Sequence, residues 1–111
     1  MVATAKRNDL ESLQAVALQA SGLLKVLANP DRLLLLCQLT QGEHCVSDLE
    51  NATGIRQPTL SQQLTVLREE NMVSTRREGK QIYYSIASKE AMAVLQVLYE
   101  QFCKKDKRMK R

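Results

Sequence analysis

Hydrophobic residues return every three or four positions between residues 10 and 27, a spacing that places them on one face of a helix. Ser21 and Gly22 interrupt the pattern, which therefore predicts either one long helix or a pair broken at that point. The next run, "PDRLLLLCQL", is apolar enough for a buried helix. Asn29 is suited to cap this second helix and Pro30 to occupy its first position.

Two shorter helices are predicted next, separated by a tight turn. The first opens at Ser47, has Glu50 at the spacing of a capping box, and stops at Gly54, a residue type that adopts the left-handed backbone at little cost. The second begins near Gln57 or Pro58. Its inward stripe consists of Leu60, Leu64 and Leu67. Two helices joined in this way form a helix-turn-helix.

The hydrophobic period changes after this pair of helices. Side chains alternate over residues 82–86 as in a strand, and residues 73–76 suit an antiparallel partner across a turn at residues 78–79. Helical spacing then returns from about residue 89 to residue 103. We therefore predict a fold that is mainly α with a small β-hairpin (α+β), a winged helix-turn-helix of four helices, two strands and a final helix.

The first and last helices are more apolar than one small domain requires, which favours a homodimer that packs through them. At 111 residues and 44% hydrophobic, the chain fits one domain, 9–103, between a flexible segment, 1–8, and a basic tail, 104–111. No stretch reaches the roughly 18 apolar residues of a membrane span, and the start lacks a secretory signal. We expect a cytoplasmic protein with no membrane partner.

The formal charge of +4 is unevenly distributed along the chain. The tail "KKDKRMKR" has six Lys or Arg against one Asp, a net charge of +5, which leaves residues 1–103 with −1. Basic patches nevertheless occur inside the domain. No acidic residue lies between Arg56 and Arg68, and "TRREGK" at residues 75–80 has a net charge of +2. These patches favour a polyanionic partner.

Small polar side chains occupy the outward face of the helix that follows Gly54, where an ordinary surface has Glu and Lys. In a winged helix-turn-helix this helix enters the DNA major groove with its N-terminal end against the base edges. Gln pairs with adenine, and Ser or Thr suits several bases. Glu would repel phosphates, and this helix contains no Glu before Glu69. A merely solvated polar face is the alternative. The predicted contacts to double-stranded operator DNA from this helix and its turn are Arg56, Gln57, Thr59, Ser61, Gln62, Gln63, Thr65 and Arg68.

Three basic residues of the hairpin, Arg76, Arg77 and Lys80, are predicted to contact phosphates. Such contacts supply affinity and register but little sequence information. Ordinary surface residues are the alternative interpretation at each position.

Four stretches together resemble the ArsR/SmtB family of winged-helix repressors over residues 15–103: "LLKVLANPDRLLLLCQL", "SDLENATGIRQPTLSQQLTVLRE", "MVSTRREGKQIYYSI" and "VLYEQFC". Within that family, Cys37 together with Cys103 is similar to the BigR-type repressors, which respond to persulfides and hydrogen sulfide. The resemblance implies a homodimer built from the first and last helices and release from operator DNA when the sensor is modified. It also implies target genes in sulfide oxidation or biofilm growth.

The resemblance makes Cys37 and Cys103 the expected sensor thiols, although buried core cysteines would be the ordinary interpretation. Lys104 and Lys105 beside Cys103 should favour its thiolate. Cys37 precedes the helix-turn-helix and Cys103 follows the hairpin, so a bridge between them would bracket the DNA-reading module. We expect persulfides or polysulfides to act as inducers. One thiolate takes up sulfane sulfur, and attack by the other closes a disulfide or polysulfide that lowers operator affinity.

Metal sensing is the first alternative, because many relatives bind metals. One family site needs a Cys-x-Cys pair where this chain has Cys45 and Ser47, and another needs His on the last helix, which contains none. A tight zinc site takes about four N or S ligands, so His44 and Cys45 fall short. We predict no metal and no cofactor, with His44 in a surface loop and Cys45 a semi-buried filler. A metal-responsive or general oxidant-responsive ArsR-type repressor remains the alternative.

Catalysis is not expected. The chain has one His, no Ser/His/Asp set, no paired carboxylates in a plausible cleft and no glycine-rich phosphate loop. A stoichiometric thiol protein and a protein-interaction module are the other classes that the sequence leaves open.

Overall fold

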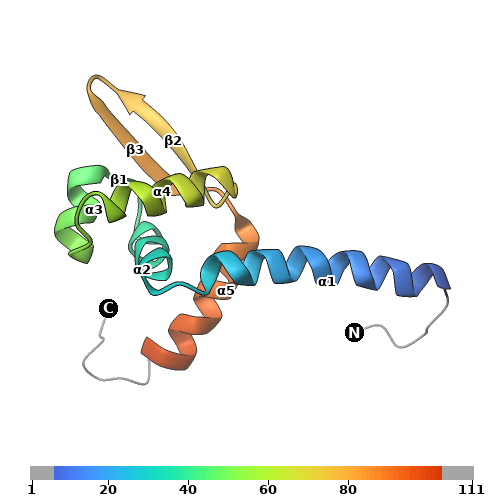
Figure 1. Ribbon diagram of the computed structural model, residues 1–111. Coiled ribbons are helices and arrows are strands. Elements are labelled where there is room, and N and C mark those ends of the chain that lie inside the picture. Colours follow the sequence, from blue (N-terminus) through green and yellow to red (C-terminus); the bar gives the residue numbers. More distant parts are fainter. Residues whose placement is uncertain (1–6, 104–111) are drawn as a thin grey trace.

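The computed structural model describes residues 7–103. The basic tail, 104–111, with Lys104 and Lys105, and all but two residues of the predicted flexible segment, 1–8, lie outside the described residues. The elements, in chain order, are α1 (Arg7–Leu27), α2 (Pro30–Leu39), β1 (His44–Cys45), α3 (Val46–Thr53), α4 (Thr59–Glu69), β2 (Val73–Glu78), β3 (Gln81–Ile86), α5 (Lys89–Leu98) and the π-helical turn η1 (Tyr99–Cys103) (Figure 1).

Helix α1 is continuous, so the alternative of a pair broken near Gly22 is wrong. The Ser21 hydroxyl donates to the carbonyl of Leu18, 3.1 Å away, and leaves the helix unbroken. Apart from its last turns, which contact the other elements, α1 extends away from them as a long rod (Figure 1). Helix α2 begins as predicted: Pro30 is its first residue, and Asn29 Oδ1 accepts from the backbone N–H of Arg32 at 3.0 Å.

Helix α3 begins one residue earlier than predicted, and the capping box is absent. Cys45 is the N-cap residue and makes no side-chain cap, while Ser47 lies inside the first turn with its Oγ 3.4 Å from Cys45 Sγ. The end of the helix is as predicted. Gly54 has a left-handed backbone (φ 76°) and donates to the carbonyl of Glu50 at 2.9 Å.

The sheet has three antiparallel strands in the order β1-β3-β2. The predicted hairpin is confirmed, with Val73 opposite Ile86 and Glu78 opposite Gln81, so its two-residue turn is Gly79-Lys80, one residue later than expected. Strand β1 was not predicted. Its two residues pair with Tyr84 and Tyr83 of β3, which corrects the expectation that His44 lies in a surface loop. A two-residue strand is too short to produce a hydrophobic period.

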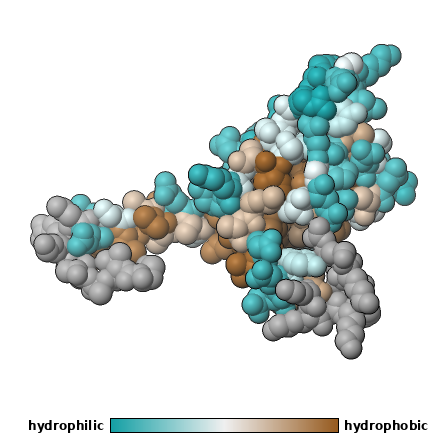
Figure 2. All heavy atoms as spheres, turned by 180° about the vertical axis from the view of Figure 1, so that it is seen from behind, coloured by the Kyte–Doolittle hydropathy of each residue, from teal (hydrophilic) through white to brown (hydrophobic). Residues whose placement is uncertain are grey.

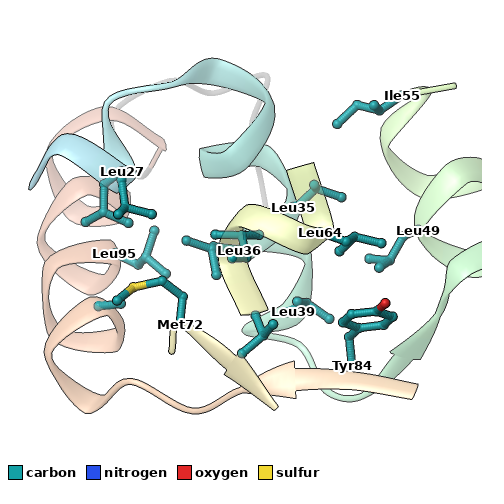
Figure 3. Packing of buried hydrophobic residues seen from close by; sticks show 14 of the residues in the cluster. Leu27, Leu35, Leu36, Leu39, Leu49, Ile55, Leu64, Met72, Tyr84 and Leu95 are labelled. Atoms are coloured by element: carbon teal, nitrogen blue, oxygen red, sulfur yellow. The ribbon is translucent and has the colours of Figure 1, made fainter. Parts of the chain in front are cut away.

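The hydrophobic core runs through α2. Leu36 is fully buried at its centre, with Leu27, Met72 and Leu95 toward one side and Leu49 and Leu64 toward the other (Figure 3). Helix α2 therefore joins α1 and α5 to the helix-turn-helix made by α3 and α4. Over residues 7–103, no helix has the length and apolar character needed to cross a membrane.

The last helix is confirmed, but it does not stay α-helical to Cys103. Ser88 caps its start by accepting from the N–H of Ala91 at 3.0 Å, and the final turn, Tyr99–Cys103, is π-helical.

Candidate nucleic-acid interface and sensor thiols

Helix α4 has two distinct faces. Its inward residues Leu60, Leu64 and Leu67 are buried as predicted. The opposite face is exposed and consists of Thr59, Ser61, Gln62 and Thr65, with Arg68 and Glu69 exposed in the last turn. The Thr65 hydroxyl donates to the Ser61 carbonyl at 2.8 Å, whereas the side chains of Ser61 and Gln62 make no hydrogen bond within residues 7–103. This face therefore presents donors and acceptors to solvent.

Gln57 lies at the start of α4, in a role that the sequence did not reveal. Its Oε1 accepts from the backbone N–H of Ser61 at 3.0 Å and so satisfies a donor of the first turn. Pro58, the N-cap residue, makes no side-chain cap. Gln57 is exposed, and its amide nitrogen makes no hydrogen bond within residues 7–103, but its oxygen accepts from the helix.

Gln63 lies on a different side of α4 from Gln62. It is half-buried, and its Oε1 accepts from Arg32 Nη1 at 3.1 Å. Of the eight predicted contacts from this helix and its turn, Gln63 is the one that is not exposed. Arg32 is 31 positions away in the sequence, so no local spacing identifies this pair.

Two basic side chains flank the exposed face of α4. Arg56 is 84% exposed, and its Nε lies 3.6 Å from Glu50 Oε2, an exposed ion pair of little strength. Arg68 is exposed in the last turn of α4. Both positions suit phosphate contacts at the edges of a groove.

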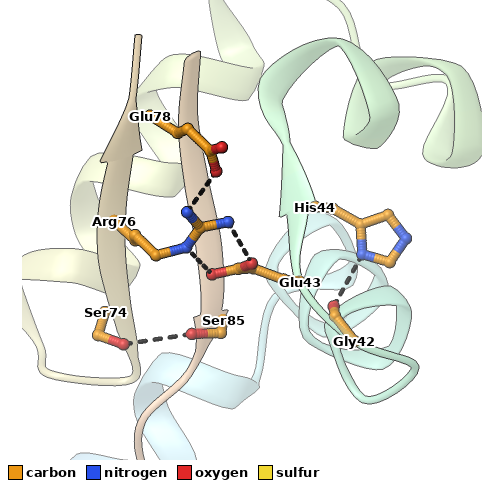
Figure 4. A network of polar contacts seen from close by, with 7 residues as sticks. All are labelled: Gly42, Glu43, His44, Ser74, Arg76, Glu78 and Ser85. Carbon is orange, nitrogen blue, oxygen red and sulfur yellow. Dashed lines mark hydrogen bonds and ion pairs between the residues drawn. The ribbon is translucent and has the colours of Figure 1, made fainter.

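Arg76 of the hairpin is held by two carboxylates. Its Nε and Nη2 donate to Glu43 at 2.9 and 2.8 Å, and its Nη1 donates to Glu78 at 2.6 Å (Figure 4). The guanidinium also lies 4.8 Å from the centre of the Tyr83 ring. The hydrogen bond from Arg76 holds the pKa of Glu43 below its ordinary value, and the pKa of Arg76 is raised in turn. Arg76 ties the segment before β1 to the hairpin, and its charge is compensated.

The other basic side chains of the hairpin lie at its tip. Arg77 is exposed, and its Nε donates to the carbonyl of Gly79 at 3.3 Å. Lys80 is exposed in the turn itself. Among the three predicted wing contacts, Arg77 and Lys80 are the two whose charge no acidic side chain compensates within the described part of the chain.

The three cysteines differ in exposure. Cys37 is exposed on α2, Cys103 is half-buried at the end of η1, and Cys45 is buried at 6% exposure. Cys45 is thus more shielded than the semi-buried position expected for it. The two predicted sensor residues are the two cysteines that are not buried.

The alternative metal ligands are engaged elsewhere. His44 Nδ1 lies 2.8 Å from the Gly42 carbonyl oxygen and Nε2 lies 3.4 Å from the Gln38 amide nitrogen, so both ring nitrogens have partners within the protein. Across residues 7–103 no three His, Cys, Asp or Glu side chains gather closely enough to hold a metal ion.

Comparison with known proteins supplies the family. Residues 29–75, which include the helix-turn-helix, match the family model for bacterial regulatory proteins of the arsR family. The chain is also 51% identical over 94 residues to the biofilm growth-associated repressor of Agrobacterium fabrum, which covers 85% of this chain and 80% of that repressor. The chain belongs to the arsR family. The family resemblance inferred from the sequence is confirmed.

Two solved structures share the fold. The repressor BigR of Xylella fastidiosa superposes with a TM-score of 0.78 at 46% identity, covering 89% of this chain and 98% of BigR. Reduced HlyU of Vibrio cholerae superposes with a TM-score of 0.80 at 33% identity, covering 84% of this chain and 98% of HlyU. The winged helix-turn-helix is therefore confirmed, and the arsR-family chain is a transcriptional repressor of the BigR type. Its relatives are regulators of transcription, which is not an enzymatic role.

Proposed function

We propose that the chain is a homodimeric repressor that binds double-stranded operator DNA through the exposed face of α4. We further propose that it releases this DNA when reactive sulfur bridges Cys37 and Cys103. The observation that carries the proposal is the exposed face of α4, which has no carboxylate before Glu69 in the last turn and lies between Arg56 and Arg68. Such a repressor works in the cytoplasm, where bacterial operators lie.

The side chains on this face suit base edges in the major groove. Ser61 and Gln62 are exposed, and the Ser61 hydroxyl and the Gln62 amide each offer a hydrogen-bond donor and an acceptor. Arg56, Arg68, and the wing-tip residues supply positive charge on either side for the phosphates. Together they form a base-reading centre with a phosphate-binding rim.

Dimerisation is supported by apolar surface on the two terminal helices. Figure 2 shows hydrophobic side chains along α1 and around its junction with the other elements, whereas the wing is mainly hydrophilic. The exposed apolar residues on α1 are Leu10, Leu13, Val16, Leu18 and Leu24, and those on α5 and η1 are Met92, Val97 and Phe102. Leu18 and Phe102 are 75% and 70% exposed, and contact with a second copy of the chain would remove this apolar surface from water.

The position of Cys37 and Cys103 outside the core supports sulfur sensing. A thiolate of Cys37 or Cys103 attacks a low-molecular-weight persulfide, becomes a protein persulfide and releases the carrier thiolate. Attack of the second thiolate on the protein-bound sulfur then closes a disulfide and releases hydrosulfide, so the sulfane sulfur is reduced while the two cysteines are oxidised. If both cysteines carry persulfides, the same attack leaves a trisulfide.

Helix α2 supplies a route from the bridge to the reading face. Cys37 lies on α2, and the neighbouring Leu36 is at the centre of the core that joins α5 to α4 (Figure 3). A bridge to η1 would pull on that packed helix. A bias of about 3 kcal/mol between two arrangements lowers operator affinity about a hundredfold, within the range of allosteric coupling.

Operator release by persulfide tests this function. Reduced protein is bound to an operator duplex selected from random sequences and then treated with glutathione persulfide, with fluorescence anisotropy as the readout. We expect affinity to fall about a hundredfold and to return on reduction. Cys37→Ser and Cys103→Ser should stay bound, while the matched control Cys45→Ser should respond like the wild type.

Two results would contradict the proposal. Release of the Cys37→Ser protein from the operator duplex by persulfide would rule out the dithiol mechanism. Equal release of the wild type by hydrogen peroxide would support a general oxidant sensor instead.

A further inference from the structure

Arg32 joins three helices, and neither the reading face nor the thiols account for it. Its Nε donates to the carbonyl of Val26 at 2.6 Å, and its Nη2 donates to the carbonyl of Lys25 at 3.3 Å. Its Nη1 donates to Gln63 Oε1 at 3.1 Å. One guanidinium from the first turn of α2 thus holds the end of α1 and the flank of α4 together.

The contacts with α1 complete the hydrogen bonding of that helix. The last four carbonyls of a helix lack partners within it. In α1 the carbonyls of Leu24 and Leu27 accept from the backbone N–H groups of residues 28 and 29, each at 2.8 Å. The remaining two, of Lys25 and Val26, accept from Arg32. A cation at this end also complements the helix dipole, so Arg32 is fixed firmly to α1.

The contact with α4 occupies the side-chain oxygen of Gln63, one of the predicted DNA contacts. Gln62 and Gln63 are neighbours on one helix, yet Gln62 is exposed and Gln63 is half-buried against Arg32. A hydrogen bond from a charged donor is roughly twice as strong as a neutral one. Gln63 therefore anchors α4 to a guanidinium that α1 already holds.

We propose that Arg32 and Gln63 are positioning residues that set the angle between α1 and α4. Because α1 carries the proposed dimer surface, this angle sets the distance between the two reading helices of a dimer and hence the spacing of the operator half-sites. Gln63 is then a specificity-determining residue for spacing, not for base identity. This inference rests on the proposed function for its effect on DNA.

A pair of matched substitutions tests the proposal. A carboxylate at residue 63 accepts the same hydrogen bond from Arg32, whereas a carboxylate at residue 62 would enter the negatively charged groove of the DNA without a partner. We expect Gln63→Glu to retain the operator affinity and spacing preference of the wild type. Gln62→Glu should lose affinity about tenfold or more, the scale of one lost base contact. Gln63→Ala should bind half-sites of altered spacing nearly as well as the natural spacing, with base preference within each half-site unchanged.

A measurement without DNA separates this inference from the proposed function. Residual dipolar couplings of the free protein give the angle between α1 and α4. We expect the wild-type angle in Gln63→Glu, and a shifted or more mobile α4 in Gln63→Ala. Unchanged couplings and spacing preference in Gln63→Ala would overturn the positioning role, and so would a loss of affinity in Gln63→Glu equal to that of Gln62→Glu. If the wild type binds no duplex while the angle between α1 and α4 still changes in Gln63→Ala, the proposed function alone would be overturned.

Discussion

At the scale of single residues, three glutamines of one short segment have three different environments. Gln57 caps the start of α4, Gln62 is exposed without a partner within residues 7–103, and Gln63 binds Arg32. The sequence predicted DNA contact for all three, because leucine spacing tells inward from outward but does not describe the flanks of a helix. The environment of Gln63 on the flank depends on Arg32, 31 positions away, which only the tertiary structure brings into contact with it.

The same scale explains Arg76, whose type and position suggest a phosphate contact. Two carboxylates compensate its charge, and the one on Glu43 comes from a segment 33 positions away. The sequence shows the basic run but not this distant partner.

The pair formed by Glu43 and Arg76 predicts a pH dependence. The pKa of Glu43 in the folded protein lies below its ordinary value of 4.5, so the carboxylate stabilises the fold above that value. The contribution is lost as the pH falls through the lowered pKa. Glu43→Gln should therefore melt at a lower temperature than the wild type at neutral pH, and the difference should vanish in acid. Melting curves over a pH series, with Glu69→Gln as control, measure this. A difference that stays constant with pH would contradict it.

At the scale of elements, the sequence predicted the features that neighbouring side chains determine. The Asn29 cap, the left-handed Gly54 and the buried leucines of α4 follow from side chains within one or two turns, and each is confirmed. Strand β1 and the early start of α3 were missed because pairing with β3 holds Cys45 extended. That pairing partner lies almost 40 residues further along the chain, beyond any local pattern.

Gly54 yields a prediction about the turn between α3 and α4. A Cβ at this position meets no atom within 4 Å, so the cost of Gly54→Ala comes only from the left-handed backbone. We expect Gly54→Ala to lower the free energy of unfolding by about 1 kcal/mol. Gly54→Asn should cost less, since Asn tolerates this conformation. Urea denaturation compares the three proteins, and an alanine variant as stable as the wild type would show that the turn relaxes.

At the scale of the whole molecule, the chain is too extended for an independent compact domain. Its radius of gyration is 16.6 Å, against about 13 Å for a compact chain of about 100 residues. The difference reflects α1, which projects from the other elements with apolar residues exposed (Figure 1). The sequence predicted an apolar surface on the terminal helices, but a single chain does not reveal how two copies meet.

The dimer proposal predicts the effect of a charge on α1. Val16 is 56% exposed in the single chain and would become buried against a second copy. Val16→Glu should shift the protein from dimer to monomer and weaken binding to a two-half-site operator, because a buried unpaired carboxylate is costly. Sedimentation equilibrium measures the shift, with Thr75→Glu on the exposed wing as control. A Val16→Glu protein as dimeric as the control would place the interface elsewhere.

We propose that the exposed face of α4 reads bases while the wing binds phosphates. The most direct test is the base preference of the protein, measured by selection from random duplexes for the wild type, Gln62→Ala and Arg77→Ala. We predict that Gln62→Ala changes the preferred operator, with about 1–3 kcal/mol of discrimination lost at one base pair. Arg77→Ala should weaken all sequences alike and reduce the slope of log affinity against log salt by about one. Equal losses on specific and random DNA for Gln62→Ala would show that Gln62 does not read a base.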